Sequence, residues 1–445
     1  MTNIPSYTAP RAQPREVWSG SRQAARPKII ALPRLAPWLA ETAFLALLLM
    51  VFIGIAPFAT RDPATFAIGE SGFAGAGDAL RQGLYLLVLV VTAGAAFEMR
   101  GLAAFRAVPV TLALLLGWCL LSAVWAPAEG VALRRAGLEV VVVLSAMLGV
   151  ESIGVERALA LLRGVLIAVL VINIVSIPLM HNAIHLPGES DPSLVGDWRG
   201  LYFHKNIAGA VSAMSAIVFF FFAVETRRGI DWALFAAAIA FTVMTHSKSS
   251  IGLLPVALIL AGVYRLAWRR GVDRAIVLLS LALVGVVAVT ALVMDSAAIT
   301  RMLEDPTQFT GRTAIWQAEI AFVRDHLLLG SGFGSFADTG ALSPLHGYVA
   351  ESWVQTEAHG HNAYLQLLVT VGGVGFVLAM IAFVWQPLAA FFRARREDLP
   401  LYTMLFALFA FMVLHNFLES DFLEGDGPAW VVFLLMLAML RTKEA

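Results

Sequence analysis

Long apolar blocks, separated by short polar connections, run through most of the chain. Most blocks approach the roughly 20 residues that a helix needs to cross a bilayer, and the fourth and twelfth are shorter. The pattern predicts twelve spans, at 37–57, 83–99, 107–126, 137–151, 158–180, 207–224, 230–246, 250–268, 275–294, 363–386, 400–418 and 429–441. Because unpaired backbone groups cannot face lipid, these spans must be helices. The sequence therefore predicts an all-α polytopic membrane protein.

Composition supports this class. Hydrophobic residues make up 59% of the 445 residues and charged residues only 14%, whereas a soluble domain has about 25% charged residues. The formal net charge is zero, so bulk charge gives no reason to expect a nucleic-acid partner. Cys119 is the one cysteine, which excludes an internal disulfide.

The extramembrane regions are few. Residues 1–35 are rich in proline and arginine, which predicts a disordered basic tail. Residues 36–445 are expected to form a single transmembrane domain with one large loop, 295–362. Within that loop, residues 311–330 have apolar positions at helical spacing, which predicts an amphipathic helix lying at the membrane interface.

Basic residues set the expected orientation. Most of the 31 lysines and arginines fall in the tail or at span ends that alternate to the same side, so the positive-inside rule places both termini in the cytoplasm. The remaining basic residues are then external. They include Arg199, Lys205, Lys248 and Arg312.

The stretch "AHGHNAYLQLL" places His359 and His361 just before an apolar span. Asn362 is a good helix N-cap, so His361 is expected just outside the helix. Three interpretations remain open from these residues alone. The histidines form a polar helix boundary, they bind zinc with Glu357, or one of them is a general base near a helix N-terminus.

A set of cations lies at the same predicted face. Arg199, His204 and Lys205 close one external loop in "DWRGLYFHKN", Lys248 lies in "THSKSS", and Arg312 begins "GRTAIW". Such groups either bind lipid headgroups or hold an anionic substrate, for which the diphosphate of a lipid carrier is the obvious candidate.

Two further stretches have competing interpretations. "GSGFGSF" (330–336) lacks the strand–turn–helix context of a nucleotide-binding loop, so a close-packed turn is favoured. The last external loop contains Glu419, Asp421, Glu424 and Asp426. A carboxylate pair there could hold a divalent metal, but ion pairs with external arginines are favoured.

The stretches "DWRGLYFHKN", "GRTAIW", "GSGFGSF" and "AHGHNAYLQLL", in this chain order, resemble the O-antigen ligase and polymerase superfamily of bacterial membrane glycosyltransferases. The ligase signature is a histidine, then Asn, Ser or Gln, nine free positions, a glycine, two free positions and Gly, Thr or Tyr. Here His361 and Asn362 are followed at the right spacing by Gly372 and Gly375. The resemblance covers roughly residues 195–425, and the twelve-span layout extends it along the chain.

The resemblance implies a GT-C-like fold and a metal-independent, inverting enzyme without a cofactor, which takes its glycan from undecaprenyl diphosphate in the periplasm. It implies that His361 is the catalytic base and that Arg199 and Arg312, with Lys205 and Lys248, bind the diphosphate. His204, Asn206, His359, Asn362 and Glu419 are expected to support them. The implied location is the bacterial inner membrane.

Lys248 separates the two branches of this superfamily, because the ligases usually have arginine there. "FHKN" and "SKSS" look more like the exopolysaccharide polymerases, so polymerisation of lipid-linked repeat units is favoured. The alternative is a ligase that attaches the glycan to lipid A–core. The partners implied are the lipid-linked donor, a glycan or lipid A–core acceptor, membrane lipid and other polysaccharide-assembly proteins. A twelve-helix transporter of lipid-linked glycans is the alternative from another class, but no pair of similar halves is visible.

Overall fold

The computed structural model describes residues 35–55, 57–58, 79–189, 192–270, 312–337, 339–349, 360–395 and 397–444. The predicted tail at 1–35 lies almost entirely outside these residues, as does the predicted span 275–294. Within the described residues the fold is helical, and the one β-type contact is an isolated bridge between Ile184 and Trp198.

The main helices follow the predicted spans. They are α1 (Leu35–Phe52), α3 (Ala79–Arg100), α4 (Val110–Leu121), α5 (Glu129–Ile153), α6 (Val155–Leu179), α7 (Lys205–Thr226), α8 (Gly229–Met244), α9 (Lys248–Arg270), α12 (Arg312–Asp325), α13 (Ala363–Met380), α14 (Gln386–Arg393), α15 (Leu399–His415) and α16 (Pro428–Glu444). Short helical turns connect them: η2 (Gly101–Ala107), η3 (Ser122–Trp125), η4 (His181–Ala183), η5 (Pro192–Leu194), η7 (Gly340–Leu342), η8 (Pro344–Gly347) and the π-turn η10 (Ile381–Trp385).

Seven of the described helical segments are long and apolar enough to cross a membrane, and three shorter apolar helices accompany them. Within the described residues this confirms a helical fold with several candidate membrane spans, whereas the count of twelve stays a prediction. A helix expected within 311–330 is present as α12, which ends at Asp325, and its position at the membrane interface stays a prediction. The span predicted at 137–151 is longer than expected. Its helix, α5, begins at Glu129, and Arg135 in its second turn donates to the carbonyl of Gly334.

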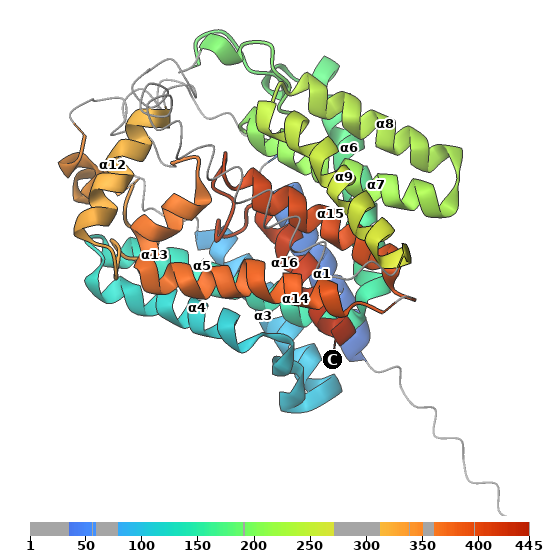
Figure 1. Cartoon of the computed structure of the whole chain (residues 1–445), viewed down its shortest axis with the longest axis horizontal. Coiled ribbons are helices and arrows are strands. Elements are labelled where there is room, and N and C mark those ends of the chain that lie inside the picture. Colours follow the sequence, from blue (N-terminus) through green and yellow to red (C-terminus); the bar gives the residue numbers. More distant parts are fainter. Residues whose placement is uncertain are drawn as a thin grey trace, which may run out of the picture. The chain divides into compact units, whose positions relative to one another are not determined.

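The described helices share one core of buried apolar side chains (Figure 1). Helices α1 and α3 contact α5, which also packs on α16; α7 packs on α8, and α9 packs on α15. Aromatic side chains fill the space around α15 and α16. Trp430 lies against Phe383, and Tyr264 stacks on Phe406 with ring centroids 4.6 Å apart.

One end of the bundle has ion pairs between its helices. Arg100 binds Glu151, Arg157 binds Glu41, Arg163 binds Asp231 and Lys443 binds Asp398. All four basic residues belong to the set predicted to be cytoplasmic. Their pairing joins these helices to one another.

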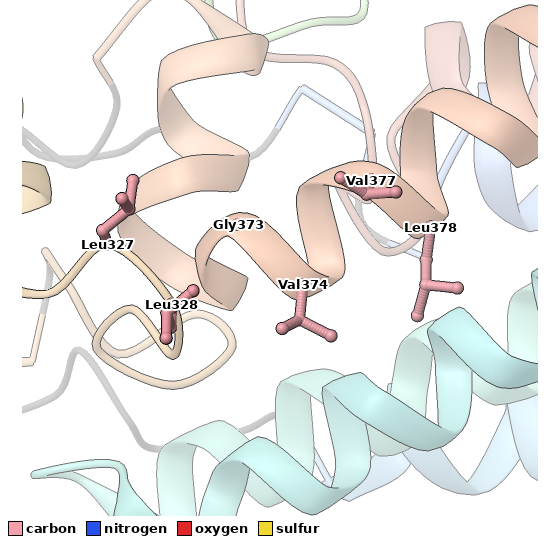
Figure 2. A pocket seen from close by; sticks show the side chains of 6 residues that line it. All are labelled: Leu327, Leu328, Gly373, Val374, Val377 and Leu378. Atoms are coloured by element: carbon pink, nitrogen blue, oxygen red, sulfur yellow. The ribbon is translucent and has the colours of Figure 1, made fainter.

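Helix α13 is broken at Gly372, the first glycine of the signature spacing. Gly372 has φ of 66° and ψ of −175°, a conformation that is open in practice only to glycine. The loop that follows α12 docks against this break (Figure 2). The N–H of Gly373 donates to the carbonyl of Leu327 at 2.7 Å, and the N–H of Ser331 donates to the carbonyl of Val369 at 2.8 Å.

Two tryptophans bind the carbonyls around the break. Trp118 Nε1 donates to the carbonyl of Val371 at 2.9 Å, and Trp125 Nε1 donates to that of Leu329 at 3.3 Å. Non-helical backbone inside a predicted span is tolerated only where protein groups bind it, and here they do. Figure 2 shows the apolar hollow that remains beside this contact, lined by Leu327, Leu328 and the side chains of Val374, Val377 and Leu378.

The "GSGFGSF" segment is a close-packed turn, as predicted. A Cβ on Gly330 would overlap the backbone of Thr370 and Gly372, and a Cβ on Gly332 would overlap Ala126. The Phe333 N–H also donates to Ser122 Oγ at 2.8 Å. The glycines therefore let the segment pack directly on α13 and on the end of α4.

Gly372→Ala is expected to destabilise the protein by at least about 2 kcal/mol. The new Cβ would be held at positive φ and would overlap the carbonyl oxygen of Leu328. Thermal unfolding of the purified protein in detergent measures the effect. Gly117→Ala, on α4 with nothing within 4 Å of the new Cβ, is the control and should leave the melting temperature unchanged or raise it. Equal melting temperatures for the two variants would contradict this role of the break.

Candidate active site

The loop between α6 and α7 is built around Arg199. Its Nε donates to the carbonyl of Asn182 at 2.8 Å, and one terminal nitrogen lies 3.1 Å from the carboxylate of Glu189. The same nitrogen donates to the carbonyl of Phe203 at 3.2 Å. The side chain is only 14% exposed. In this structure, then, the guanidinium predicted to clamp a diphosphate organises the loop that precedes α7.

His185 joins that loop to the start of α7. Its Nδ1 lies 2.5 Å from Glu189 Oε2, and its Nε2 accepts the N–H of Lys205 at 3.2 Å. The carboxylate can only accept, so the proton is on Nδ1 and the ring is neutral. Burial lowers the pKa of His185, in agreement with a neutral ring. This residue therefore fixes where the first residue of α7 lies.

Lys205 and His246 share one carboxylate. Lys205 Nζ lies 2.5 Å from Asp197 Oδ2, and His246 Nδ1 lies 2.5 Å from Asp197 Oδ1. Asp197 is buried, and its contacts with Lys205 and His246 compensate for the loss of its hydration. They link the loop before α7 to the turn before α9.

Asn206 and His361 share a second carboxylate. Asn206 Nδ2 donates to Glu419 Oε1 at 2.9 Å, and His361 Nδ1 lies 3.0 Å from Glu419 Oε2. Glu419 is also buried. With the carboxylate as acceptor, His361 Nδ1 carries a proton and Nε2 keeps its lone pair. Among the described residues no group binds this Nε2, so it is available to accept a proton from a ligand.

Hydrogen bonds to the residues before and after His361 fix the turn that contains it. Asn362 caps α13 as predicted, with its Oδ1 accepting the N–H of Leu365 at 3.1 Å. Trp316 Nε1 donates to the carbonyl of Gly360 at 2.6 Å. His361 itself has φ of 51°, a left-handed conformation that is uncommon for a residue with a side chain. Such strain persists only where the surroundings impose it.

Glu319 on α12 occupies the space beside Gly360. A Cβ on Gly360 would overlap the Glu319 carboxyl group, so only glycine fits there. Glu319 is 1% exposed, and no residue that the structure describes forms a hydrogen bond with its Oε2. Burial raises the pKa of Glu319 to about 8, so the side chain is protonated at neutral pH. A neutral acid thus packs against the turn that precedes the candidate base.

A third carboxylate–histidine pair stabilises the loop after α15. His415 Nδ1 lies 2.7 Å from Asp421 Oδ2, and its Nε2 lies 3.4 Å from Ser250 Oγ. His415 and Ser250 are both buried, so this arrangement connects α9 to the loop and does not face a ligand. The carbonyl of Glu419, in the same loop, accepts the N–H of Ala363 at 3.0 Å. In this loop Asp426 binds Arg81, the kind of ion pair favoured from the sequence.

The remaining predicted residues lie as follows. His204 is the N-cap of α7, where its Nδ1 accepts the N–H of Asn206 at 3.2 Å, and burial lowers its pKa to about 4. Lys248 is exposed at the first residue of α9 and forms no ion pair with any residue that the structure describes. Arg312 begins α12, but its side chain and all of His359 lie outside the described residues.

The structure thus brings together His204, Lys205, Asn206, His361, Asn362 and Glu419 from segments far apart in the sequence. Sequence reasoning missed His185, Asp197, His246 and Glu319. Asp197 and His246 lie within the quoted stretches "DWRGLYFHKN" and "THSKSS", but only the fold reveals that they bind each other.

Comparison with known proteins bears on the same region. Residues 233–380 match the family model described as O-Antigen ligase. This segment runs from α8 through α13 and includes Lys248, His361 and both signature glycines. The match confirms the resemblance to the O-antigen ligase superfamily and supports a membrane glycosyltransferase of the ligase or polymerase type. No curated protein matches the chain.

Glu319→Gln is expected to change how stability depends on pH. Between pH 4.5 and about 8 the folded protein keeps a proton on Glu319 that the unfolded chain has lost, so the free energy of unfolding falls as pH rises through this window. Glutamine removes that slope. The variant should therefore gain on the order of a few kcal/mol relative to wild type between pH 4.5 and 8.

Melting temperatures from pH 5 to 8.5 test this. The exposed Glu397→Gln variant is the control and should follow wild type at every pH. A difference between Glu319→Gln and wild type that is the same at every pH would show that Glu319 is ionised in the fold.

Proposed function

We propose that the chain is a membrane glycosyltransferase that moves an oligosaccharide from undecaprenyl diphosphate to an acceptor hydroxyl on the periplasmic side of the inner membrane. The observation that carries this proposal is the His361–Glu419 pair, in which Nδ1 is bound and no described residue binds Nε2, with His361 inside a segment that matches the O-antigen ligase family. A histidine held by a carboxylate in this way is suited to accept a proton.

The transfer is proposed to proceed in one displacement. The acceptor oxygen attacks the anomeric carbon on the face opposite the diphosphate, and its proton passes to His361 Nε2. The bond between the anomeric carbon and the phosphate oxygen breaks, and its electron pair leaves with the diphosphate. Glu419 then stabilises the imidazolium that has formed. The configuration of the sugar inverts, and neither a metal nor a cofactor takes part in this scheme.

The leaving diphosphate requires positive charge. Helices α7, α9 and α13 all begin at this end of the bundle, and each helix N-terminus has a partial positive charge of about half a unit. Lys248 at the start of α9 adds a full charge that no described carboxylate neutralises. Arg312 at the start of α12 is proposed to act with it. Arg199 and Lys205 are bound to Glu189 and Asp197, so we propose that they contribute mainly by holding the loop.

Polymerisation is the favoured reaction, and ligation is the second candidate. Lys248 in "SKSS" favours joining lipid-linked repeat units to each other, whereas the description of the matching family favours transfer to lipid A–core. Both reactions use the same donor and the same base. They differ in the acceptor alone.

His361→Asn is expected to lower turnover by about 10²- to 10⁴-fold, the range for a general base. Asparagine tolerates the left-handed conformation at this position, so the fold should be kept. Turnover is measured in liposomes with undecaprenyl diphosphate-linked repeat units, and melting temperature is measured in parallel. The exposed His346→Asn variant is the control. Turnover near that of wild type in His361→Asn would exclude His361 as the base.

The size distribution of the product separates the two reactions. With lipid-linked repeat units as the only substrate, wild-type protein is expected to give a ladder on a gel. A single transfer that needs added lipid A–core would instead identify a ligase. In that case Lys248 would not distinguish the branches.

A further inference from the structure

His246 shares three features with His361. Both have left-handed backbone conformations, with φ of 49° and 51°. Each lies two residues before the first residue of a helix, His246 before α9 and His361 before α13. Each also places Nδ1 on a carboxylate, Asp197 or Glu419. Among the described residues, the other non-glycine residues with positive φ are Phe58, Arg227 and Leu423.

In the His246–Asp197 pair the carboxylate is buried and the imidazole ring is exposed. Asp197 is 6% exposed, whereas the His246 side chain is 60% exposed. The carboxylate fixes the orientation of the ring through Nδ1, and no described residue binds Nε2. The edge of the ring that can meet a ligand therefore faces outward, while the carboxylate that orients it is part of the core.

The two histidine–carboxylate pairs are joined by consecutive residues. Lys205 binds Asp197, and Asn206 binds Glu419. Their Cα atoms are about 3.8 Å apart, as in any trans peptide. Both carboxylates are held by the first two residues of α7, so the two histidine–carboxylate pairs meet the same helix N-terminus.

We infer that His246 is a second catalytic histidine, which donates a hydrogen bond from its protonated Nε2 to a phosphate oxygen of the leaving diphosphate. This inference rests on the proposed function and assigns a different role to each histidine. His361 takes the proton of the acceptor, and His246 meets the negative charge that develops on the leaving group. Lys248, two residues further on and exposed, adds a second positive charge to the same turn.

The charges around His246 favour this role. Asp197 accepts from Nδ1, and Lys205 binds the other oxygen of Asp197, so the carboxylate that orients the ring is itself held in place. A diphosphate on the Nε2 side would bring its negative charge to the ring N–H and to Lys248.

Three variants test the inference in the full-length protein. His246→Asn keeps a residue that tolerates positive φ and removes the imidazole. His246→Lys keeps a positive charge at the same place. His181→Asn changes an exposed histidine of the loop before α7 that has no carboxylate partner among the described residues, and serves as the control.

Two measurements are made on each variant. The first is the affinity for inorganic diphosphate in detergent without phospholipid, which does not depend on any transferase activity. The second is turnover in liposomes. His246→Asn is expected to bind diphosphate about 10- to 100-fold more weakly, the worth of one charge-assisted hydrogen bond. It should also lower turnover, and His246→Lys should restore much of both binding and turnover.

The outcomes separate the two proposals. If His246→Asn binds diphosphate as tightly as wild type, or if wild type does not bind it, the inference is wrong even when the protein transfers glycans. If binding weakens in His246→Asn but wild type transfers no glycan, His246 is an anion ligand and the proposed transferase function is wrong. A loss of binding in His181→Asn equal to that in His246→Asn would also overturn the inference.

Discussion

The break in α13 at Gly372 is the constraint on which the candidate site depends. A helix inside a membrane span binds its own backbone groups, and any interruption leaves N–H and carbonyl groups that must find other partners. Here the loop after α12 and the indole groups of Trp118 and Trp125 supply them. That contact ties α12 to α13, and α12 in turn holds Gly360 through Trp316 and Glu319. The position of His361 thus follows from hydrogen bonds made around Gly372, nine residues beyond the first residue of its helix.

Burial of the carboxylates determines how the charged side chains of the site pair with one another. Asp197, Glu189 and Glu419 are each at least partly removed from water, and each binds histidine together with a further polar side chain. Because an unpartnered buried carboxylate is costly, these groups fix the rings that they bind. The same physics explains why Arg199 faces the loop. Glu189 and two carbonyls accept from its Nε and one terminal nitrogen, so in this structure the guanidinium is a support for the loop.

Much of the helical layout could be predicted from the sequence because it depends on local patterns. Apolar length predicted the spans, Asn362 predicted the start of α13, and the spacing of glycines predicted a packed turn at 330–336. The pairing of His246 with Asp197 could not be predicted in this way. The two residues are 49 positions apart, and neither has a spacing that marks it as a ligand or a base. Pairings that depend on how the chain packs, such as that of Arg199 with Glu189, have no signature in a single sequence.

The adjacency of Lys205 and Asn206 has a mechanical consequence. Consecutive residues of a helix point about 100° apart, so the two side chains leave α7 in different directions and hold carboxylates on two sides of its axis. A small rotation of α7 would therefore act on Asp197 and Glu419 together. The first turn of α7 thus couples the positions of the two imidazole rings, which lie on different segments.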